Sequence, residues 1–412
     1  MSGQVFVIVG ASLGGLRAAE ALRSRGFAGR IVLIGEEQHA PYERPPLSKG
    51  VLHGTVGLDA LTLRTDWDGI EVEFIPGDRA VDIDAGLREV VLASTRRVKA
   101  DAVLLATGGR PTDIALPGID LPGVFTLRDI DEALELAPLL TPGSRLVVIG
   151  GGFIGLEVAA SAQVRGCDVT VIEAATVPLA RGLGSEWGGF IAEHHLMRGV
   201  RIGTGVGVRA LRGTGRLQQV ELEDGTVLDA DVAVVGVGMT PRTELAEGLG
   251  IAVDRGIVVD AWARTSNPSV FAVGDVTVQP SWTGDRLVRY ESFQNAQDQA
   301  GVAAAAMLGQ EPPRREPPWF WSDQFDLNIQ TAGELGGADE IIVRGDRDSD
   351  SFAAFHLRSS RVAGVFAINR AKDVRAGMKL MESGIPVTED DLLDESVDLR
   401  RLAKKVVAHR RP

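Results

Sequence analysis

The 412-residue sequence contains a single cysteine, Cys167, so this chain cannot form an intramolecular disulfide. Its six histidines are scattered and form no Cys/His cluster spaced for a metal, so no metal site is predicted. The longest apolar runs, such as VFVIVG and ADVAVVGVG, are far shorter than the roughly 20 residues that span a bilayer. No membrane-embedded segment is therefore expected.

Basic residues are outnumbered by acidic ones, 43 to 56, so that the formal net charge is −13. A general nucleic-acid binder neutralises phosphates with basic side chains, so this balance disfavours nucleic acid as a partner. The first residues, MSGQ, lead directly into an apolar stretch without a basic segment, so no secretory signal is predicted and a cytoplasmic location is expected. With 44% apolar and 24% charged residues, the chain has a globular composition and the length of two or three domains.

Glycine, by contrast, is abundant, with 50 residues, and its placement is informative. An apolar run, a glycine-rich turn and residues at helical spacing follow one another in VFVIVGASLGGLRAAEALRSRG (5–26), and again in SRLVVIGGGFIGLEVAASAQVRG (144–166). A second apolar run follows each, RIVLIGEE (30–37) and CDVTVIEA (167–174). The sequence thus predicts two strand–helix–strand units, offset by 140 residues from Gly10 to Gly150.

Both units carry the pattern of a dinucleotide-binding turn, in which glycines allow a tight turn, close approach of a pyrophosphate and close helix packing. The second copy has all three glycines, Gly150, Gly152 and Gly155, whereas the first has Ser12 between Gly10 and Gly15. An acidic residue, expected about 20 positions later to bind a ribose hydroxyl, is present in each copy as Glu36 and Glu173. One such turn is commonly a packing feature, but two complete copies predict two bound dinucleotides.

The remaining sequence completes these units and adds a third domain. ADAVLLATGGRP (100–111) and ADVAVVGVGMTP (230–241) have the same form, and each is expected to add a buried strand to one unit. SNPSVFAVGDV (266–276) predicts a strand that ends at Gly274 and Asp275, where an open α/β sheet has its ligand crevice. Proline-rich QEPPRREPPWFW (310–321) is interpreted as a linker. Short strands and a helix near 370–383 then predict an α+β domain.

Six motifs occur in order along nearly the whole chain: PYERPPLSK (41–49), ATGGRP (106–111), GGGFIGLE (150–157), FAVGDV (271–276), YESFQNAQDQ (290–299) and PWFWSDQ (318–324). With them the chain resembles the two-dinucleotide-binding flavoprotein superfamily. Within that superfamily it resembles the FAD- and NADH-dependent ferredoxin reductases of bacterial oxygenase systems, of the putidaredoxin reductase and rhodocoxin reductase type. The implied fold class is α/β and glutathione-reductase-like, with two Rossmann-like domains and a C-terminal α+β domain.

The resemblance implies an FAD-binding domain at 1–112 and 240–318, an NADH-binding domain inserted at 113–239, and a C-terminal interface or dimerisation-like domain at 319–412. The implied FAD-binding residues are Gly10, Ser12, Leu13, Gly14, Gly15, Glu36, Arg44, Lys49, Ala80, Val81, Ala106, Thr107, Gly108, Arg110, Gly274, Asp275, Glu291, Ser292, Phe293 and Trp321. The implied NADH-binding residues are Gly150, Gly152, Phe153, Ile154, Gly155, Glu157, Glu173, Arg181, Gly236 and Gly238.

Lys49 and Glu157 are the catalytic residues implied by the resemblance, paired beside the flavin and the nicotinamide. The alternative for Glu157 is that it lies in the first turn of its helix and complements the helix dipole. Glu173, followed by Ala174 and Ala175, favours NADH over NADPH, although Arg181 lies nearby in sequence.

Four further residues carry alternatives or a departure from the family pattern. For Arg44 and Arg110 the alternative is a surface ion pair, and for Trp321, next to Trp319, it is ordinary core packing. Phe293 stands where family members often have tryptophan, which weakens any stacking role there.

Ser48 lies where related enzymes carry a redox cysteine, so dithiol chemistry is not expected. The resemblance implies direct electron transfer to a 2Fe–2S ferredoxin, which serves an oxygenase of the cytochrome P-450 or dioxygenase kind. A rubredoxin reductase and an apoptosis-inducing-factor-like NADH sensor are the alternatives, and the chain is expected to be a monomer or weak homodimer. Docking of an acidic ferredoxin would need a local basic patch, with candidates at Arg286, Arg289, Arg361, Arg370, Lys372 and Arg375.

Overall fold

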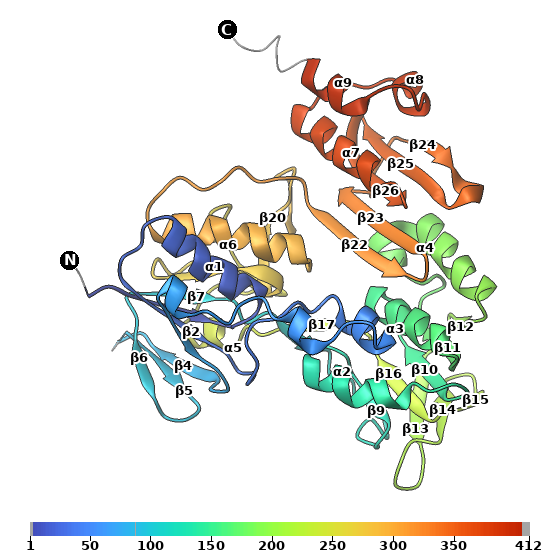
Figure 1. Cartoon of the computed structure of the whole chain (residues 1–412), viewed down its shortest axis with the longest axis horizontal. Coiled ribbons are helices and arrows are strands. Elements are labelled where there is room, and N and C mark those ends of the chain that lie inside the picture. Colours follow the sequence, from blue (N-terminus) through green and yellow to red (C-terminus); the bar gives the residue numbers. More distant parts are fainter. Residues whose placement is uncertain (1–2, 87, 406–412) are drawn as a thin grey trace. The chain divides into compact units, whose positions relative to one another are not determined.

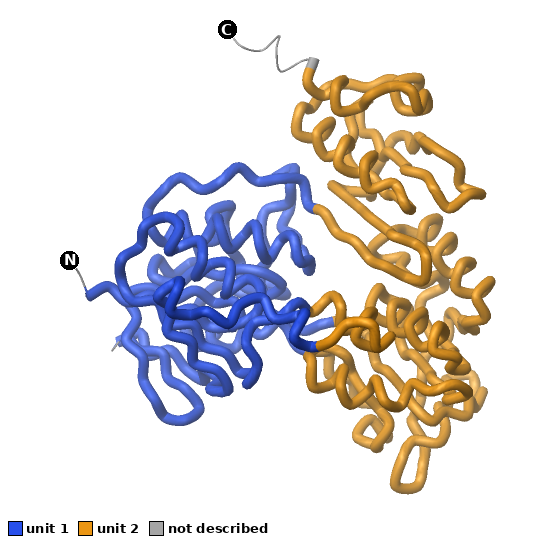
Figure 2. Tube along the Cα trace, in the orientation of Figure 1, with its two compact units in different colours: residues 1–43, 58–110, 239–318 blue, residues 44–57, 111–238, 319–412 orange. Residues whose placement is uncertain are grey.

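The computed structural model describes residues 3–86 and 88–405. The chain forms two compact units, unit 1 from residues 1–43, 58–110 and 239–318, and unit 2 from residues 44–57, 111–238 and 319–412 (Figure 2). Residues 44–57, which the sequence assigned to the FAD-binding domain, belong to unit 2, because the short helix η1 (Leu47–Val51) contacts α3 (Phe153–Val164).

Unit 1 is built around a parallel sheet with the strand order β19-β7-β1-β2-β3. Its strands are β1 (Val5–Val9), β2 (Arg30–Ile34), β3 (Val72–Ile75), β7 (Ala102–Leu105) and β19 (Val270–Ala272). Ile8 faces a core that includes residues of α1 (Leu13–Ser24) and α6 (Phe293–Met307), and Val7 faces a second core on the other side. Burial on both faces explains why the first strand is a continuous apolar run.

Smaller elements complete unit 1. They are β4 (Ala80–Asp84), β5 (Glu89–Leu92) and β6 (Arg97–Lys99), the sheet β18 (Ile257–Val258), β20 (Thr277–Pro280) and β21 (Leu287–Val288), and the helix α5 (Glu244–Gly248). The strands β8 (Gly109–Pro111) and β17 (Met239–Pro241) pair where the chain passes from one unit to the other.

Unit 2 repeats this plan, with a parallel sheet of order β12-β11-β10-β16-β9. Its strands are β9 (Val124–Phe125), β10 (Arg145–Ile149), β11 (Asp168–Glu173), β12 (Arg201–Thr204) and β16 (Val232–Val235). Its further elements are α2 (Ile130–Leu136), α3, α4 (Ala180–Met197) and the antiparallel sheet β13 (Val208–Arg212), β14 (Gln219–Leu222) and β15 (Val227–Asp229). The predicted pair of strand–helix–strand units is thus confirmed, with β10 in the place of β1. Cys167 is buried in the core of unit 2.

The C-terminal part of unit 2 is an antiparallel sheet of order β22-β23-β26-β25-β24 with helices after it in the chain (Figure 1). Its elements are β22 (Trp319–Gln324), β23 (Leu327–Gly333), β24 (Glu340–Asp346), β25 (Ser351–Arg358), β26 (Arg361–Ile368), α7 (Ala371–Ser383), α8 (Glu389–Leu393) and α9 (Leu399–Lys405). The helix predicted near 370–383 is α7, while α8 and α9 had not been predicted. Phe366 stacks on Trp187 of α4, with ring centroids 4.7 Å apart, which joins this sheet to the core of unit 2.

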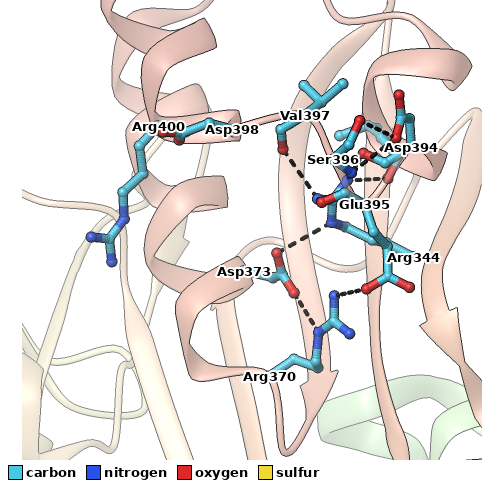
Figure 3. A network of polar contacts seen from close by, with 10 residues as sticks. Arg344, Arg370, Asp373, Asp394, Glu395, Ser396, Val397, Asp398 and Arg400 are labelled. Carbon is cyan, nitrogen blue, oxygen red and sulfur yellow. Dashed lines mark hydrogen bonds and ion pairs between the residues drawn. The ribbon is translucent and has the colours of Figure 1, made fainter.

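One buried guanidinium, that of Arg344 in β24, holds the segment that links α8 to α9 (Figure 3). Its two terminal nitrogens donate to the carbonyl oxygens of Leu392, Asp394, Glu395 and Val397 at 2.7–3.1 Å. Its Nε lies 3.4 Å from a carboxylate oxygen of Asp373 on α7. A single side chain therefore satisfies several backbone acceptors of an otherwise irregular segment.

We expect Arg344→Met to lower the free energy of unfolding of the C-terminal domain by about 3 kcal/mol, because it leaves buried acceptors without a donor. Urea unfolding, together with amide hydrogen exchange over 389–404, measures this effect. The exposed Arg375→Met on α7 is the matched control and should change stability by less than about 0.5 kcal/mol. Equal stability of the two variants would contradict the role assigned to Arg344.

Candidate functional site

The first glycine of each turn has a conformation that other residues avoid, with φ +114° at Gly10 and φ +108° at Gly150. A Cβ atom would lie 2.1 Å from the carbonyl oxygen of Ala106 at Gly10, and 2.4 Å from that of Gly236 at Gly150. These carbonyls belong to the residues directly after β7 and β16. Each turn therefore packs against the end of the neighbouring strand, and only glycine fits there.

The third glycine of each turn lets the helix begin directly against the turn. A Cβ atom would lie 1.9 Å from the carbonyl oxygen of Gly10 at Gly15, and 2.1 Å from that of Gly150 at Gly155. The two turns thus share the same steric requirements, although they lie in different units. This duplication is a property of the backbone geometry as well as of the sequence.

The middle position of the glycine turn in unit 2, Gly152, has open space beside it. A Cβ atom at Gly152 would meet no atom of the described chain within 4 Å, and Gly152 is the N-cap of α3. The first-turn N–H groups of a helix lack partners within the helix, and they bind phosphate readily. The open space and the helix start together fit the diphosphate of a dinucleotide. In unit 1 Ser12 is the N-cap of α1, so a small hydroxyl side chain occupies this position.

The two acidic residues differ in their surroundings. At the end of β11, Glu173 accepts hydrogen bonds from the backbone N–H of Gly151 and of Ala175, both at 2.7 Å, which fixes it beside the glycine turn. Glu36 forms an ion pair with Arg242 and lies 3.8 Å from the Nε of Arg79. Sequence reasoning had not identified Arg242, because it lies 206 residues away from Glu36.

The carboxyl edge of the parallel sheet in unit 1 brings together several predicted FAD-binding residues. Gly10, Ala106 and Gly274 follow β1, β7 and β19, and the Gly274 N–H donates to the side-chain oxygen of Gln299 at 2.7 Å. Ligands bind at this edge in open α/β sheets. Next to Ala106 and Gly274 in the chain lie Thr107, Gly108 and Asp275.

Other predicted FAD-binding residues of unit 1 have protein partners or lie in other elements. Arg110 forms an ion pair with Glu244 at 2.5 Å, which is the alternative that the sequence left open. Glu291 pairs with Arg289 at 2.5 Å. The remaining ones are Ser292, which caps α6, Phe293, the first residue of α6, and Ala80 and Val81 in β4.

In unit 2, Arg44 donates to the backbone carbonyl of Arg128 at 2.6 Å. The rings of Trp321 and Trp319 are stacked, with centroids 5.1 Å apart. Of the predicted NADH-binding residues, Phe153 contacts the ring of Phe320, with centroids 4.5 Å apart. The others are Ile154, which is 46% exposed, Arg181, exposed in the first turn of α4, and Gly236 and Gly238, which follow β16.

Lys49 and Glu157 meet in unit 2, with Nζ of Lys49 2.8 Å from Oε2 of Glu157. Glu157 is the fifth residue of α3, which begins at Phe153, so the first-turn alternative is wrong. A carboxylate beyond the first turn gains little from the helix dipole, because that effect falls off within one turn. Glu157 is stabilised by other side chains instead.

Two serines complete the surroundings of Glu157, and sequence reasoning had not assigned either of them to it. Ser48 donates to Oε2 at 2.5 Å, and Ser322 of β22 donates to Oε1 at 2.6 Å. Glu157 is only 3% exposed, and three donors are what a buried carboxylate needs. Ser161, one turn after Glu157 on α3, donates to the carbonyl of Ser48 at 2.6 Å and so fixes the position of η1.

In the part of the chain that the structure describes, no group of three His, Cys, Asp or Glu side chains is placed to hold a metal ion. Within the same residues, no helix combines the length and apolar character needed to cross a membrane.

A family model described as pyridine nucleotide-disulphide oxidoreductase matches residues 5–300, and one described as reductase C-terminal matches residues 319–403. The chain belongs to the pyridine nucleotide-disulphide oxidoreductase family. The first match contains both glycine turns together with Lys49 and Glu157, and the second contains Ser322 and Trp321. The resemblance drawn from the six motifs is confirmed.

Several relatives match along almost the whole chain. Rhodocoxin reductase from Rhodococcus erythropolis is 41% identical over 96% of this chain and 93% of its own length. The ferredoxin–NAD(+) reductase subunit of a benzene 1,2-dioxygenase system from Pseudomonas putida is 36% identical, over 96% and 97%. The structure of a covalent putidaredoxin reductase–putidaredoxin complex matches with a TM-score of 0.94 and 35% identity, covering 99% of both chains.

We expect Gly152→Ala to weaken the binding of NADH, the dinucleotide expected at this turn, about tenfold, because the methyl group would fill the open space. The φ of −78° at Gly152 suits alanine, so the thermal unfolding temperature should stay nearly unchanged. Calorimetric titration with NADH tests this. Gly155→Ala is the contrast, since its Cβ would clash with backbone and should destabilise the fold. Unchanged affinity of Gly152→Ala would contradict the assignment.

Proposed function

We propose that this protein is an FAD-containing NADH:ferredoxin oxidoreductase that supplies electrons to an oxygenase. The observation that carries the proposal is the duplicated dinucleotide turn, one in each unit, with the same steric requirements at its first and third glycines. Bound FAD and NADH supply the redox chemistry, in which a hydride passes from NADH to FAD and its two electrons then leave in two single-electron transfers to ferredoxin. The protein binds and orients these groups and sets the charge around them.

We assign FAD to the turn of unit 1 and NADH to the turn of unit 2. The three-domain division at 1–112 with 240–318, 113–239 and 319–412 is part of the same proposal, with residues 44–57 of the FAD-binding domain packed in unit 2. In unit 1, Gly10, Ser12 and Gly15 would receive the FAD diphosphate. In unit 2, Gly150, Gly152 and Gly155 would receive the diphosphate of NADH, and Glu173 would bind its adenosine ribose. Because both oxygens of Glu173 already accept backbone N–H groups, its carboxylate is held in place and would repel a 2′-phosphate.

Lys49 and Glu157 are the residues to which we assign the catalytic role. Lys49 brings a positive charge that favours negative charge on a neighbouring group, and Glu157 keeps that ammonium in one position. Paired, the two charges avoid the cost that either would have alone in a buried site.

A one-electron acceptor fits the single thiol of the chain, because a second redox cysteine would be needed for dithiol exchange. Ser48 hydrogen bonds to Glu157 at the place where related enzymes carry a cysteine. The similarity to ferredoxin reductases of oxygenase systems supports a ferredoxin of the 2Fe–2S kind as the acceptor. A cytoplasmic location and a monomer or weak homodimer belong to the same proposal.

The basic side chains considered for ferredoxin docking differ in their partners. Arg289 and Arg370 form ion pairs, with Glu291 and with Asp373 and Glu395 respectively. Lys372 and Arg375, one helical turn apart on α7, are exposed. We favour this face of α7 among the candidates, because paired charges attract a partner less strongly.

The purified protein should be yellow, and NADH should bleach it and sustain the reduction of a 2Fe–2S ferredoxin. Stopped-flow absorbance and ferredoxin-dependent cytochrome c reduction measure the two steps. Rapid bleaching without transfer to any ferredoxin or rubredoxin, together with a long-lived reduced complex, would favour an NADH sensor and contradict the proposal.

NADPH should bleach the protein at least about tenfold more slowly than NADH, since Glu173 repels its extra phosphate. In Glu173→Gln the ratio of the bleaching rate with NADH to the rate with NADPH should fall.

We expect Lys49→Met to slow NADH-driven bleaching about 10- to 100-fold, because Glu157 loses a charged donor and the site loses its positive charge. Rapid mixing at saturating NADH measures this rate. Lys99→Met, an exposed lysine in β6, is the matched control. If the two variants bleach equally fast, Lys49 has no catalytic role.

A further inference from the structure

Beyond Glu157, a line of buried side chains continues from Ser322 into α4. The side-chain nitrogen of Gln324 donates to Oγ of Ser322 at 3.0 Å, and Nε2 of His195 lies 2.8 Å from the side-chain oxygen of Gln324. Ser322, Gln324 and His195 are each at most 1% exposed. These three residues, which we call the relay, are not assigned to the catalytic or binding residues above.

The direction of every hydrogen bond in the relay follows from the charge of Glu157. An ionised carboxylate only accepts, so Ser322 must donate its single hydrogen to Glu157. Ser322 must then accept from Gln324, which turns the amide nitrogen of Gln324 toward it and the amide oxygen toward His195. His195 must therefore carry its hydrogen on Nε2.

His195 is held as a neutral imidazole. Burial, together with the nearby positive charge of Arg198, lowers the pKa of His195 to about 4, although its bond to Gln324 opposes this. Its Nδ1 atom has no hydrogen-bond partner within the described part of the chain. A group that remains uncharged and donates from one fixed nitrogen is suited to orienting Gln324.

The strand geometry explains why Ser322 and Gln324 act together. Alternate residues of a strand point to the same face, so Phe320, Ser322 and Gln324 share one face of β22, whereas Trp319 and Trp321 share the other. Phe320 contacts Phe153, and Ser322 contacts Glu157, both on α3. One face of β22 is thus directed to α3 and its carboxylate.

We propose that Gln324 and His195 are positioning residues for the catalytic pair, because through Ser322 they orient the carboxylate of Glu157 that holds Lys49. This inference rests on the function proposed for Lys49 and Glu157. The C-terminal domain thereby contributes to the geometry of a carboxylate that lies on the dinucleotide-binding helix α3. Its contribution is made through hydrogen bonds rather than through contact with a reacting group.

The charged groups around the relay come from several elements. They are Lys49 of η1, Glu157 of α3, His194, His195 and Arg198 of α4, Asp323 of β22 and Asp326 of the following turn. Asp326 pairs with Arg198, and Asp323 accepts from Asn328 at 2.6 Å. The hydrogen bonds of Gln324 thus lead to two titratable groups, to His195 directly and to Glu157 through Ser322.

Gln324→Glu tests the relay through pH. Protonated, the new carboxyl group can still donate to Ser322, but when ionised it only accepts and draws the Ser322 hydroxyl away from Glu157. We expect NADH-driven bleaching of this variant to fall about tenfold between about pH 5.5 and about pH 9, relative to wild type. Gln330→Glu, a buried glutamine of β23 outside the relay, is the matched control and should follow the wild-type profile. A Gln324→Glu profile parallel to wild type would overturn the proposal.

The serine gives a second variant if Gln324→Glu does not fold. Ser322→Ala should slow bleaching about tenfold, whereas Ser322→Thr, which keeps the hydroxyl, should restore most of the rate. Equal rates for alanine and threonine would overturn the role of Ser322.

A measurement independent of activity separates the relay from the proposed function. Nitrogen-15 NMR of wild type, with His195 assigned from its loss in His195→Asn, should show a neutral Nε2–H tautomer at about pH 7. A protonated His195 cation, or a neutral His195 with its hydrogen on Nδ1, at about pH 7 would overturn the relay even if the enzyme is active. If NADH fails to bleach the wild type while this tautomer is observed, the proposed function fails, and with it the positioning role.

Discussion

A buried negative charge sets the strongest constraint in unit 2. The carboxylate of Glu157 is almost completely removed from water, and it is stable only because Lys49, Ser48 and Ser322 donate to it from two different elements. The short helix η1 and the strand β22 must therefore both contact α3. Segments that lie far from α3 in sequence are thus tied to it by the need to satisfy one side chain.

The dinucleotide turns depend on a different principle, because they are built from backbone. At Gly10 and Gly150 the strand-to-helix turn approaches a neighbouring strand so closely that no side chain fits. A turn of this kind depends little on the surrounding side chains, because N–H groups at a helix start are suited to binding phosphate. The two turns therefore share one geometry although their glutamates have different partners: Glu173 is bonded to its own turn, and Glu36 is paired with Arg242 and Arg79.

Sequence patterns predicted the features that arise from local spacing. The glycine turns, the parallel strands and the helix α7 follow from short-range periodicity and from the steric limits on glycine. The partners of Glu157 were only partly predicted: Lys49 came from the family resemblance, but Ser48 and Ser322 have no local signature, and neither does Gln324, which bonds to Ser322. Hydroxyl and amide side chains occur throughout any sequence, and their role depends on which strand face meets which helix. The pairing of Glu36 with Arg242 escaped prediction for the same reason, because it joins residues that only the fold brings together.

The alternation along β22 also limits where this chain can change its length. The connector at 310–318 contains no helix or strand, so extra residues there would interrupt no strand. One extra residue within Trp319–Gln324 would instead move the residues on one side of the insertion to the opposite face, which breaks the alternation of indole rings with hydroxyl and amide groups. A change in chain length is therefore compatible with the alternation along β22 before the strand begins, and incompatible with it once the strand has started.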